Sequence, residues 1–309
     1  MRAAGALRLS AINKPGGAGC AASANLLTYD ANGNLKNYKD FNGMVTTYTY
    51  DLARNLETQR VDAFGTPQVR TTTTEWHPTF NYPQRIAEPK RITTFTYYPT
   101  GNPETKTVRT TSDLTGAQGL AATQSTAFLK STYTYDPVSR LLTATAPATM
   151  GRLPTTLTYT YSGGNLATIK NGLGHITTYS NYTLDGRVGQ ITKANGVKFT
   201  YTYFPRGWVA SETVTGGTQT RLTKYTYDGT GQLKTATLPD LSVVTFGYDD
   251  AHRLTTITDI LGNKITYELD PMGNRKVKKI TDPSGVLARQ TTWIYDALNR
   301  VQTSTGEIN

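Results

Sequence analysis

Short stretches in which apolar and polar residues alternate recur along nearly the whole chain. In residues 48–50 (YTY), 133–135 (YTY) and 199–203 (FTYTY), every second residue is aromatic and the residues between are threonines. Side chains two apart on a β-strand point to the same face of the sheet. The pattern therefore predicts half-buried strands with rings on one face and threonines on the other.

The residues that close these strands recur at regular intervals. If the last aromatic residue of each run, or the Leu that replaces it, is taken as an anchor, the chain contains twelve anchors. Six of the eleven gaps between them are 21 residues long and three are 26. The sequence is therefore an internal repeat. The anchors are Tyr29, Tyr50, Trp76, Tyr97, Tyr135, Tyr161, Tyr182, Tyr203, Tyr227, Tyr248, Leu269 and Tyr295.

The positions after each anchor follow the consensus Y-D-x-x-G-[NR]-L. Asp follows the anchor directly in seven units, and Gly stands four residues after it in six. An Asp carboxylate can accept a hydrogen bond from the backbone N–H two residues on, and Gly adopts the positive φ that a tight turn needs. Each unit is thus predicted to be a strand, a first turn and a return strand, followed by a second turn such as 40–43 or 259–262.

The fold class predicted is all-β: tandem repeats forming a curled or spiral antiparallel sheet over residues 25–309. The 57 threonines and 20 tyrosines among 309 residues agree, because both types favour strands. Some 24 strands cannot stay flat in a twisted sheet, so the sheet must curl. We expect residues 1–24 to be an irregular segment and residues 112–127 to be a loop insertion, not a linker.

The consensus resembles the YD repeat of Rhs proteins, which is shared with the shells of bacterial ABC toxin complexes and with teneurins. The similarity spans residues 25–309, and segments 29–35 (YDANGNL) and 76–81 (WHPTFN) are typical of proteobacterial Rhs cores. The resemblance implies a β-strand spiral that is part of a hollow, cocoon-like shell. In that family the shell encloses a C-terminal toxic domain until its delivery, and an aspartate-dependent cleavage at a D-P-x-G-[LW] segment frees the toxin.

The resemblance therefore suggests a fragment of a shell, because neither a closing core segment nor a toxin is recognisable here. Segment 282–286 (DPSGV) resembles the D-P-x-G motif, but it occupies the place of an ordinary second turn. The partners implied are an encapsulated toxin domain and the remaining shell segments. A secretion apparatus or a surface carbohydrate would be a further partner, and the location implied is secreted or cell-surface, without a convincing signal peptide.

No candidate catalytic, cofactor or metal residue emerges from the sequence. His77, His175 and His252 are far apart, and two of them replace turn residues: His77 the Asp and His252 the Gly. Cys20 has no partner cysteine and lies in a stretch rich in Gly and Ala. The repeated Asp residues lack the D-x-D-x-D-G spacing of a calcium loop. We therefore expect a protein that is not an enzyme and has no cofactor.

The net charge of +10 is spread along the repeat and does not predict nucleic-acid binding. One dense basic cluster occurs at Arg275, Lys276, Lys278 and Lys279, which we interpret as a solvated strand face. Residues 181–183 (NYT) match a glycosylation sequon by pattern only. No stretch approaches the ~18 apolar residues of a membrane-spanning helix.

Two functions remain open from the sequence. The first is a structural shell-wall module of an Rhs-type polymorphic toxin or secreted effector. The alternative is a cell-surface adhesion or carbohydrate-binding repeat protein, in which exposed Tyr and Asn would stack on and hydrogen-bond to sugars. Packed rings would favour the wall, and a solvent-lined aromatic groove would favour binding.

Overall fold

The computed structural model describes residues 2–3, 6–14, 23–148, 153–295 and 300–308. In these residues the protein is all-β, and η1 (Gly119–Ala121), a single turn of 3₁₀-helix, is the one helix. The all-β prediction is thus confirmed. The chain divides into two compact units, Met1–Tyr159 with Lys170–Gly174 (unit 1) and Thr160–Ile169 with His175–Asn309 (unit 2).

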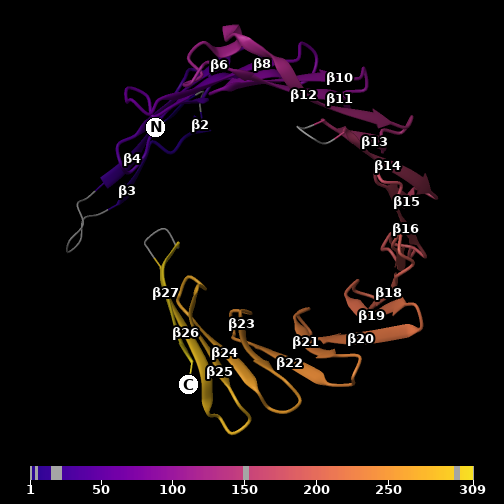
Figure 1. Ribbon diagram of the computed structural model, residues 1–309. Coiled ribbons are helices and arrows are strands. Elements are labelled where there is room, and N and C mark those ends of the chain that lie inside the picture. Colours follow the sequence, from indigo (N-terminus) through magenta and orange to yellow (C-terminus); the bar gives the residue numbers. More distant parts are fainter. Residues whose placement is uncertain (1, 4–5, 15–22, 149–152, 296–299, 309) are drawn as a thin grey trace. The chain divides into compact units, whose positions relative to one another are not determined.

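Unit 1 is a meander in which strands that follow one another in the sequence pair antiparallel (Figure 1). Its strands are β1 (Arg2–Ala3), β2 (Ala6–Leu7), β3 (Ala11–Lys14), β4 (Ser23–Tyr29), β5 (Leu35–Lys39), β6 (Val45–Asp51), β7 (Leu56–Asp62), β8 (Arg70–Trp76), β9 (Pro83–Glu88), β10 (Arg91–Tyr97), β11 (Pro103–Thr111), β12 (Gln124–Tyr135) and β13 (Leu141–Ala146). Residues of β14 (Thr155–Ser162) and β15 (Asn165–Lys170) belong to both units.

Unit 2 continues the same antiparallel order. Its strands are β16 (Ile176–Ser180), β17 (Gln190–Thr192), β18 (Lys198–Tyr203), β19 (Val209–Gly216), β20 (Gln219–Tyr227), β21 (Leu233–Thr237), β22 (Val243–Tyr248), β23 (Leu254–Thr258), β24 (Lys264–Leu269), β25 (Arg275–Thr281), β26 (Leu287–Tyr295) and β27 (Val301–Ile308). Within each unit the sheet is curved, as the sequence predicts for so many twisted strands (Figure 1).

The two faces of the sheet differ as the alternating pattern predicts. Tyr50, Tyr135 and Tyr203 are half-buried, whereas Thr49, Thr134 and Thr202, which directly precede them, are exposed. On the threonine face, hydroxyl groups pair across neighbouring strands at 2.6–2.9 Å. Such cross-strand pairs stabilise a sheet from its solvated side. We call the two sides the aromatic face and the threonine face.

The N-terminal segment differs from its prediction. Residues 1–24 were expected to be irregular, but Ala11–Lys14 forms β3, which pairs antiparallel with β4. Two short strands, β1 and β2, pair with each other before it. The repeat consensus does not reach these residues, so the sequence pattern gave no sign that an additional strand extends the sheet.

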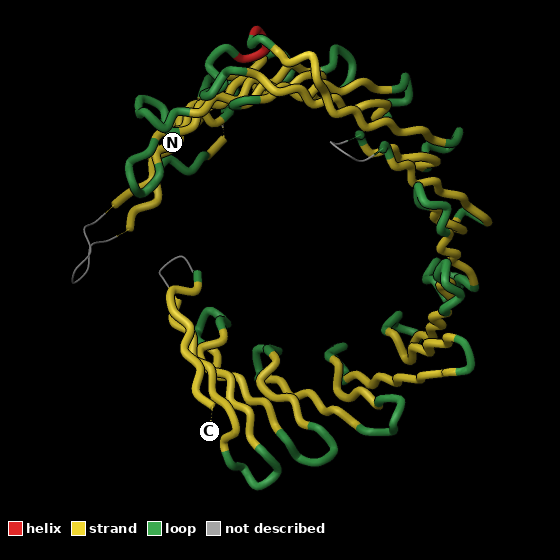
Figure 2. Tube along the Cα trace, viewed as in Figure 1, coloured by secondary structure: helices red, strands yellow, loops and turns green. Residues whose placement is uncertain are grey.

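The insertion between β11 and β12 covers part of the threonine face of unit 1. It contacts β8 and β9, with the Thr71 amide donating to Thr115 O at 2.7 Å and the Lys90 amide donating to Asp113 O at 2.6 Å. Figure 2 shows η1 on the convex side of the unit 1 sheet. Strand β12 begins at Gln124, so the irregular part is residues 112–123, shorter than the predicted 112–127.

Beneath this insertion lies a buried apolar cluster. Ala87 and Ile92 are each 1% exposed and Ala122 is 5% exposed, with Leu120 packed against them. Ala87 and Ile92 lie on the threonine face, whose residues are otherwise mainly polar. The insertion thus turns a locally apolar patch of a solvated face into a small hydrophobic core.

Candidate functional site

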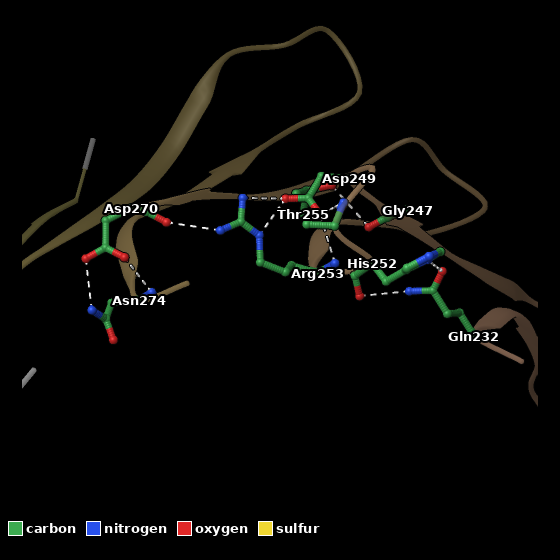
Figure 3. Close-up of polar contacts among 9 residues, drawn as sticks. Gln232, Gly247, Asp249, His252, Arg253, Thr255, Asp270 and Asn274 are labelled. Atoms are coloured by element: carbon green, nitrogen blue, oxygen red, sulfur yellow. Dashed lines mark hydrogen bonds and ion pairs between the residues drawn. The ribbon is translucent and has the colours of Figure 1, made fainter. Parts of the chain in front are cut away.

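Where an Asp directly follows the anchor, the first turn is built around its carboxylate. In the turn after Tyr248, Asp249 Oδ1 accepts the amides of Ala251 at 3.1 Å and Arg253 at 2.9 Å (Figure 3). Arg253 Nε also donates to Asp249 Oδ2 at 2.7 Å. The bond to the amide two residues on was predicted. The role of the Asn or Arg at the fifth position after the anchor was not predicted: its side chain donates a hydrogen bond to the second carboxylate oxygen.

The first turns of successive units also bind one another. Arg253 Nη1 donates to the carbonyl of Asp270 in the next turn at 3.1 Å, and Gln232 Nε2 donates to the carbonyl of His252 at 2.8 Å (Figure 3). In unit 1, the side-chain amides of Asn32 and Asn34 both donate to Asn55 Oδ1 in the next turn. These bonds form a polar ladder of first turns along one edge of the sheet in each unit.

Acid should loosen this ladder. Hydrogen bonds from Thr230, Arg253 and Asn274 lower the pKa of Asp228, Asp249 and Asp270, respectively. Because these carboxylates have a lower pKa in the folded state than in the unfolded one, their stabilisation is complete above about pH 4 and is lost as the pH falls through the folded-state values. We expect the urea midpoint to fall between about pH 4 and about pH 2.

Substitution of Asp249 separates the charge from the hydrogen-bonding geometry. Asp249→Asn keeps an oxygen that can accept the two amides but loses the pairing with Arg253, whereas Asp249→Ala loses both. At neutral pH the amides of Ala251 and Arg253 should exchange with deuterium fastest in the alanine variant and at an intermediate rate in the asparagine variant. Equal exchange in all three proteins would contradict the role assigned to the carboxylate.

Seven of the twelve anchors, as far as the described residues show, are tied to the preceding part of the chain through the polar atom of their ring. The hydroxyl of Tyr203 donates to Val188 O at 2.8 Å and that of Tyr248 to Leu233 O at 3.0 Å; Trp76 uses its indole N–H on Glu57 O at 2.8 Å. The same bond is made by Tyr29, Tyr97, Tyr182 and Tyr295.

A β-bulge lies at Tyr203 and at nine other anchors, namely Tyr29, Tyr50, Trp76, Tyr97, Tyr135, Tyr227, Tyr248, Leu269 and Tyr295. Each bulge interrupts the backbone hydrogen bonding between the two strands at the anchor.

Tyr203→Phe tests this tie. The change removes one hydroxyl and leaves the carbonyl of Val188 without that donor, so we expect a loss of about 1 kcal/mol in the stability of that region. Tyr227→Phe is the matched control, because the Tyr227 hydroxyl makes no hydrogen bond within the described part of the chain. Hydrogen exchange of the β18 and β20 amides should report a change in the first variant and none in the second.

Two of the three histidines occupy turn positions and stabilise the turns there. His77 Nδ1 accepts the amides of Thr79 and Phe80, each at 3.2 Å, which is the role of the Asp it replaces. His252 adopts φ 62°, the conformation of the Gly it replaces, and its ring nitrogen lies 2.9 Å from Gln232 Oε1 (Figure 3). Both assignments to turn positions made from the sequence are confirmed.

The other candidate residues do not converge on a site. His175 is exposed and directly precedes β16, and Cys20 lies outside the described residues. Asn181, the first residue of the sequon, directly follows β16 in a left-handed conformation, φ 55°, and is not part of a strand. Within the ranges that the structure describes, no three His, Cys, Asp or Glu side chains are close enough to hold a metal ion.

The basic cluster of β25 is divided between the two faces. Lys278 pairs in register with Tyr267 on the aromatic face, while Lys279 donates to Glu268 at 2.5 Å on the threonine face. Arg275 lies over the Tyr267 ring, 4.4 Å from its centroid. The cluster is therefore not a single basic patch.

Segment 282–286, which resembles the D-P-x-G motif, forms a turn in which Asp282 accepts the amides of Ser284 and Val286. The prediction of an ordinary second turn at this segment is confirmed.

Two hollows in the surface share one architecture. In unit 2, Phe204, Pro205, Arg206, Trp208 and Tyr227 line a space of about 340 Å³. In unit 1, a space of about 290 Å³ is lined by Tyr98, Pro99, Thr100, Asn102, Thr134, Tyr135, Asp136 and Pro137. In both, an aromatic residue and a proline replace the first two residues of the turn, and the ring meets the next anchor edge-on.

The geometry of this edge-on contact is nearly constant. Phe204 and Tyr227 have ring centroids 6.1 Å apart at 87°, and Tyr98 and Tyr135 are 6.0 Å apart at 84°. His77, also followed by a proline, meets Tyr97 at 5.7 Å and 80°. This variant of the turn was not predicted from the sequence. Its signal is an aromatic residue in place of Asp, followed directly by Pro.

Each unit of this chain is a hairpin whose turn and anchor contact the unit before or after it, which defines a β-repeat array. The RHS Repeat family model matches residues 29–67 and 248–287. Together with the twelve anchors in register, this match shows that the chain carries Rhs/YD repeats. No curated protein sequence matches it, and among the described residues no helix is long and apolar enough to cross a membrane.

Solved structures show the same fold. The crystal structure of TcdB2-TccC3-TEV superposes with a TM-score of 0.70 at 14% identity, over 90% of this chain and 16% of that chain. The chain thus spans about a sixth of that protein's length. Weaker likenesses are TcdB2-TccC3 (TM-score 0.45, 14% identity, 91% of this chain and 20% of that one) and a Tc holotoxin pore of Photorhabdus luminescens (0.41, 12%, 93% and 21%).

Proposed function

We propose that the chain is a structural wall segment of an Rhs-type toxin or secreted effector, with no enzymatic role. The observation that carries the proposal is the superposition on TcdB2-TccC3-TEV over 90% of the chain, because the fold is shared along the whole repeat array. The half-buried anchor rings, with hydroxyls that donate to backbone carbonyls, support a structural use of the aromatic face.

The remaining shell and an enclosed polypeptide would be the partners of this wall, and the location would be extracellular after export. The aromatic face is suited to line such an enclosure, since several of its anchor rings already donate to backbone carbonyls of neighbouring units. The threonine face, with its exposed hydroxyl pairs, is suited to water.

Electron microscopy of the protein expressed from its intact gene would test the proposal. We expect hollow particles whose interior holds protease-resistant density, and we expect a polypeptide to become sensitive to protease when the particle is opened by denaturant. Extended, unenclosed ribbons with no protected polypeptide would contradict it.

A further inference from the structure

We propose that the hollow at Phe204, Pro205, Arg206, Trp208 and Tyr227 is a binding site for an extended, proline-containing polypeptide segment that carries acidic residues. The inference goes beyond the proposed wall function, since a wall segment requires no such site. It rests on four features of this hollow: the arrangement of its rings, its unused donors, its composition and its charge.

The three aromatic rings of the hollow are inclined to one another. Phe204 meets Tyr227 edge-on, and Trp208 is tilted by 37° from Tyr227 with centroids 5.2 Å apart. Trp208 is fixed in place because it lies against Gly231, where a Cβ would come within 2.6 Å of the indole. Phe204 remains 39% exposed. Inclined, partly exposed rings on a fixed backbone leave slots of the kind that receive pyrrolidine rings.

Two hydrogen-bond donors at this hollow are unused. The indole N–H of Trp208 donates to no acceptor in the residues that the structure describes, and neither does the Tyr227 hydroxyl, although other anchors bond to the preceding unit. Both groups can donate to backbone carbonyls. An extended polyproline II segment has its carbonyls free, because that conformation has no internal hydrogen bonds.

The lining favours a peptide over a sugar. None of the five lining residues is an Asn, Asp, Gln or Glu, the side chains that would hydrogen-bond to several sugar hydroxyls at once. The apolar rings suit proline, and polyproline II segments lose little conformational entropy on docking.

The positive charge of Arg206 favours acidic residues beside the prolines of the bound peptide. The Arg206 guanidinium lies 5.4 Å from the centre of the Trp208 ring and donates one hydrogen bond, to Gly229 O at 3.0 Å. Its remaining N–H groups and its charge have no carboxylate partner among the described residues. An Asp or Glu next to the docked prolines would supply that partner.

Fluorescence polarisation with the full chain tests the proposal. The probe is a short fluorescein-labelled peptide of repeating Pro-Pro-Asp, compared with peptides of repeating Ala-Ala-Asp and Pro-Pro-Lys. We expect saturable binding of the first, and binding at least about tenfold weaker for the other two. Tyr227→Phe keeps the ring and removes only its donor, and Trp208→Phe keeps an aromatic ring, though a smaller one, and removes the indole N–H. Each should weaken binding by about fivefold or more.

Trp293→Phe is the matched control and should leave binding unchanged. Circular dichroism melts of the variants show whether each remains folded, so that a loss of binding reports on the hollow alone. Absence of saturable binding up to about 1 mM peptide, equal binding of the Ala-Ala-Asp peptide, or equal binding by the Trp208 and Tyr227 variants would overturn the proposal. Preferential displacement of the probe by a neutral oligosaccharide would overturn it in favour of a sugar site.

Discussion

Gly116→Ala should detach the insertion from the sheet. Gly116 has φ +80°, and a Cβ at this position would lie 2.0 Å from the backbone oxygen of Thr71. A backbone atom in a paired strand cannot move aside cheaply, so the insertion must shift. We expect a loss of about 3 kcal/mol in local stability, the sum of left-handed strain and the steric clash.

Gly65→Ala is a closely matched control. Gly65 has φ +78°, almost the same backbone conformation, but a Cβ there would meet nothing within 4 Å. This variant should therefore show the conformational cost alone, about 1–2 kcal/mol. The difference between the two variants isolates the contact between the insertion and β8.

Hydrogen exchange provides the measurement, because a repeat array need not unfold in a single two-state step. The amides of Thr71 and Lys90 bond to the insertion at 2.7 and 2.6 Å and report directly on its docking. They should lose protection in Gly116→Ala and keep it in Gly65→Ala. Protection that survives in Gly116→Ala would show that the insertion is not packed as described.

Ile92→Ala should be the most damaging change of a single apolar side chain. Ile92 is 1% exposed and lies between the sheet and the insertion with Ala87 and Ala122. Truncation removes buried methyl groups and leaves a cavity lined by fixed backbone, with an expected cost of about 3 kcal/mol. The loss should appear in urea denaturation and as faster cleavage of residues 112–123 by protease.

Ile257→Ala serves as the comparison, since Ile257 is only half-buried on the aromatic face of β23 and no insertion covers it. Its truncation should cost about 1 kcal/mol, because less surface returns to water. Equal costs at the two positions would contradict the conclusion that the insertion creates a local core.

Asp113 explains how a polar loop can be buried. Its side chain accepts the amides of Thr115, Gly116 and Gln118 while remaining only 5% exposed. Burial raises the pKa of this carboxyl. The hydrogen bonds from Gln118, Thr115 and Gly116 together lower the pKa by more than burial raises it, so the net shift is downward. The insertion therefore brings its own partners for the charge that it buries.

The prediction of strands, turns and faces succeeded where the information is local. Alternation at residues 199–203 placed Tyr203 and Thr202 on opposite faces, and the Asp after anchors such as Tyr248 predicted a turn that the structure contains. The extra strand β3 was missed because its residues lack the consensus. No pattern in the sequence indicates which carbonyl a distant hydroxyl will reach.

The sequence by itself determined the repeat, the length of its strands and the place of its turns, because these depend on residues a few positions apart. Only the tertiary structure decided that residues 112–123 cover β8 and β9, that Tyr203 bonds to Val188, and that Phe204, Trp208 and Tyr227 form one hollow. The contacts of the insertion with the sheet, of Tyr203 with Val188, and of Phe204 and Trp208 with Tyr227 join residues 15 or more positions apart in the sequence. They depend on how each hairpin twists onto the next. That twist is set by the pairing of the strands and not by any one segment.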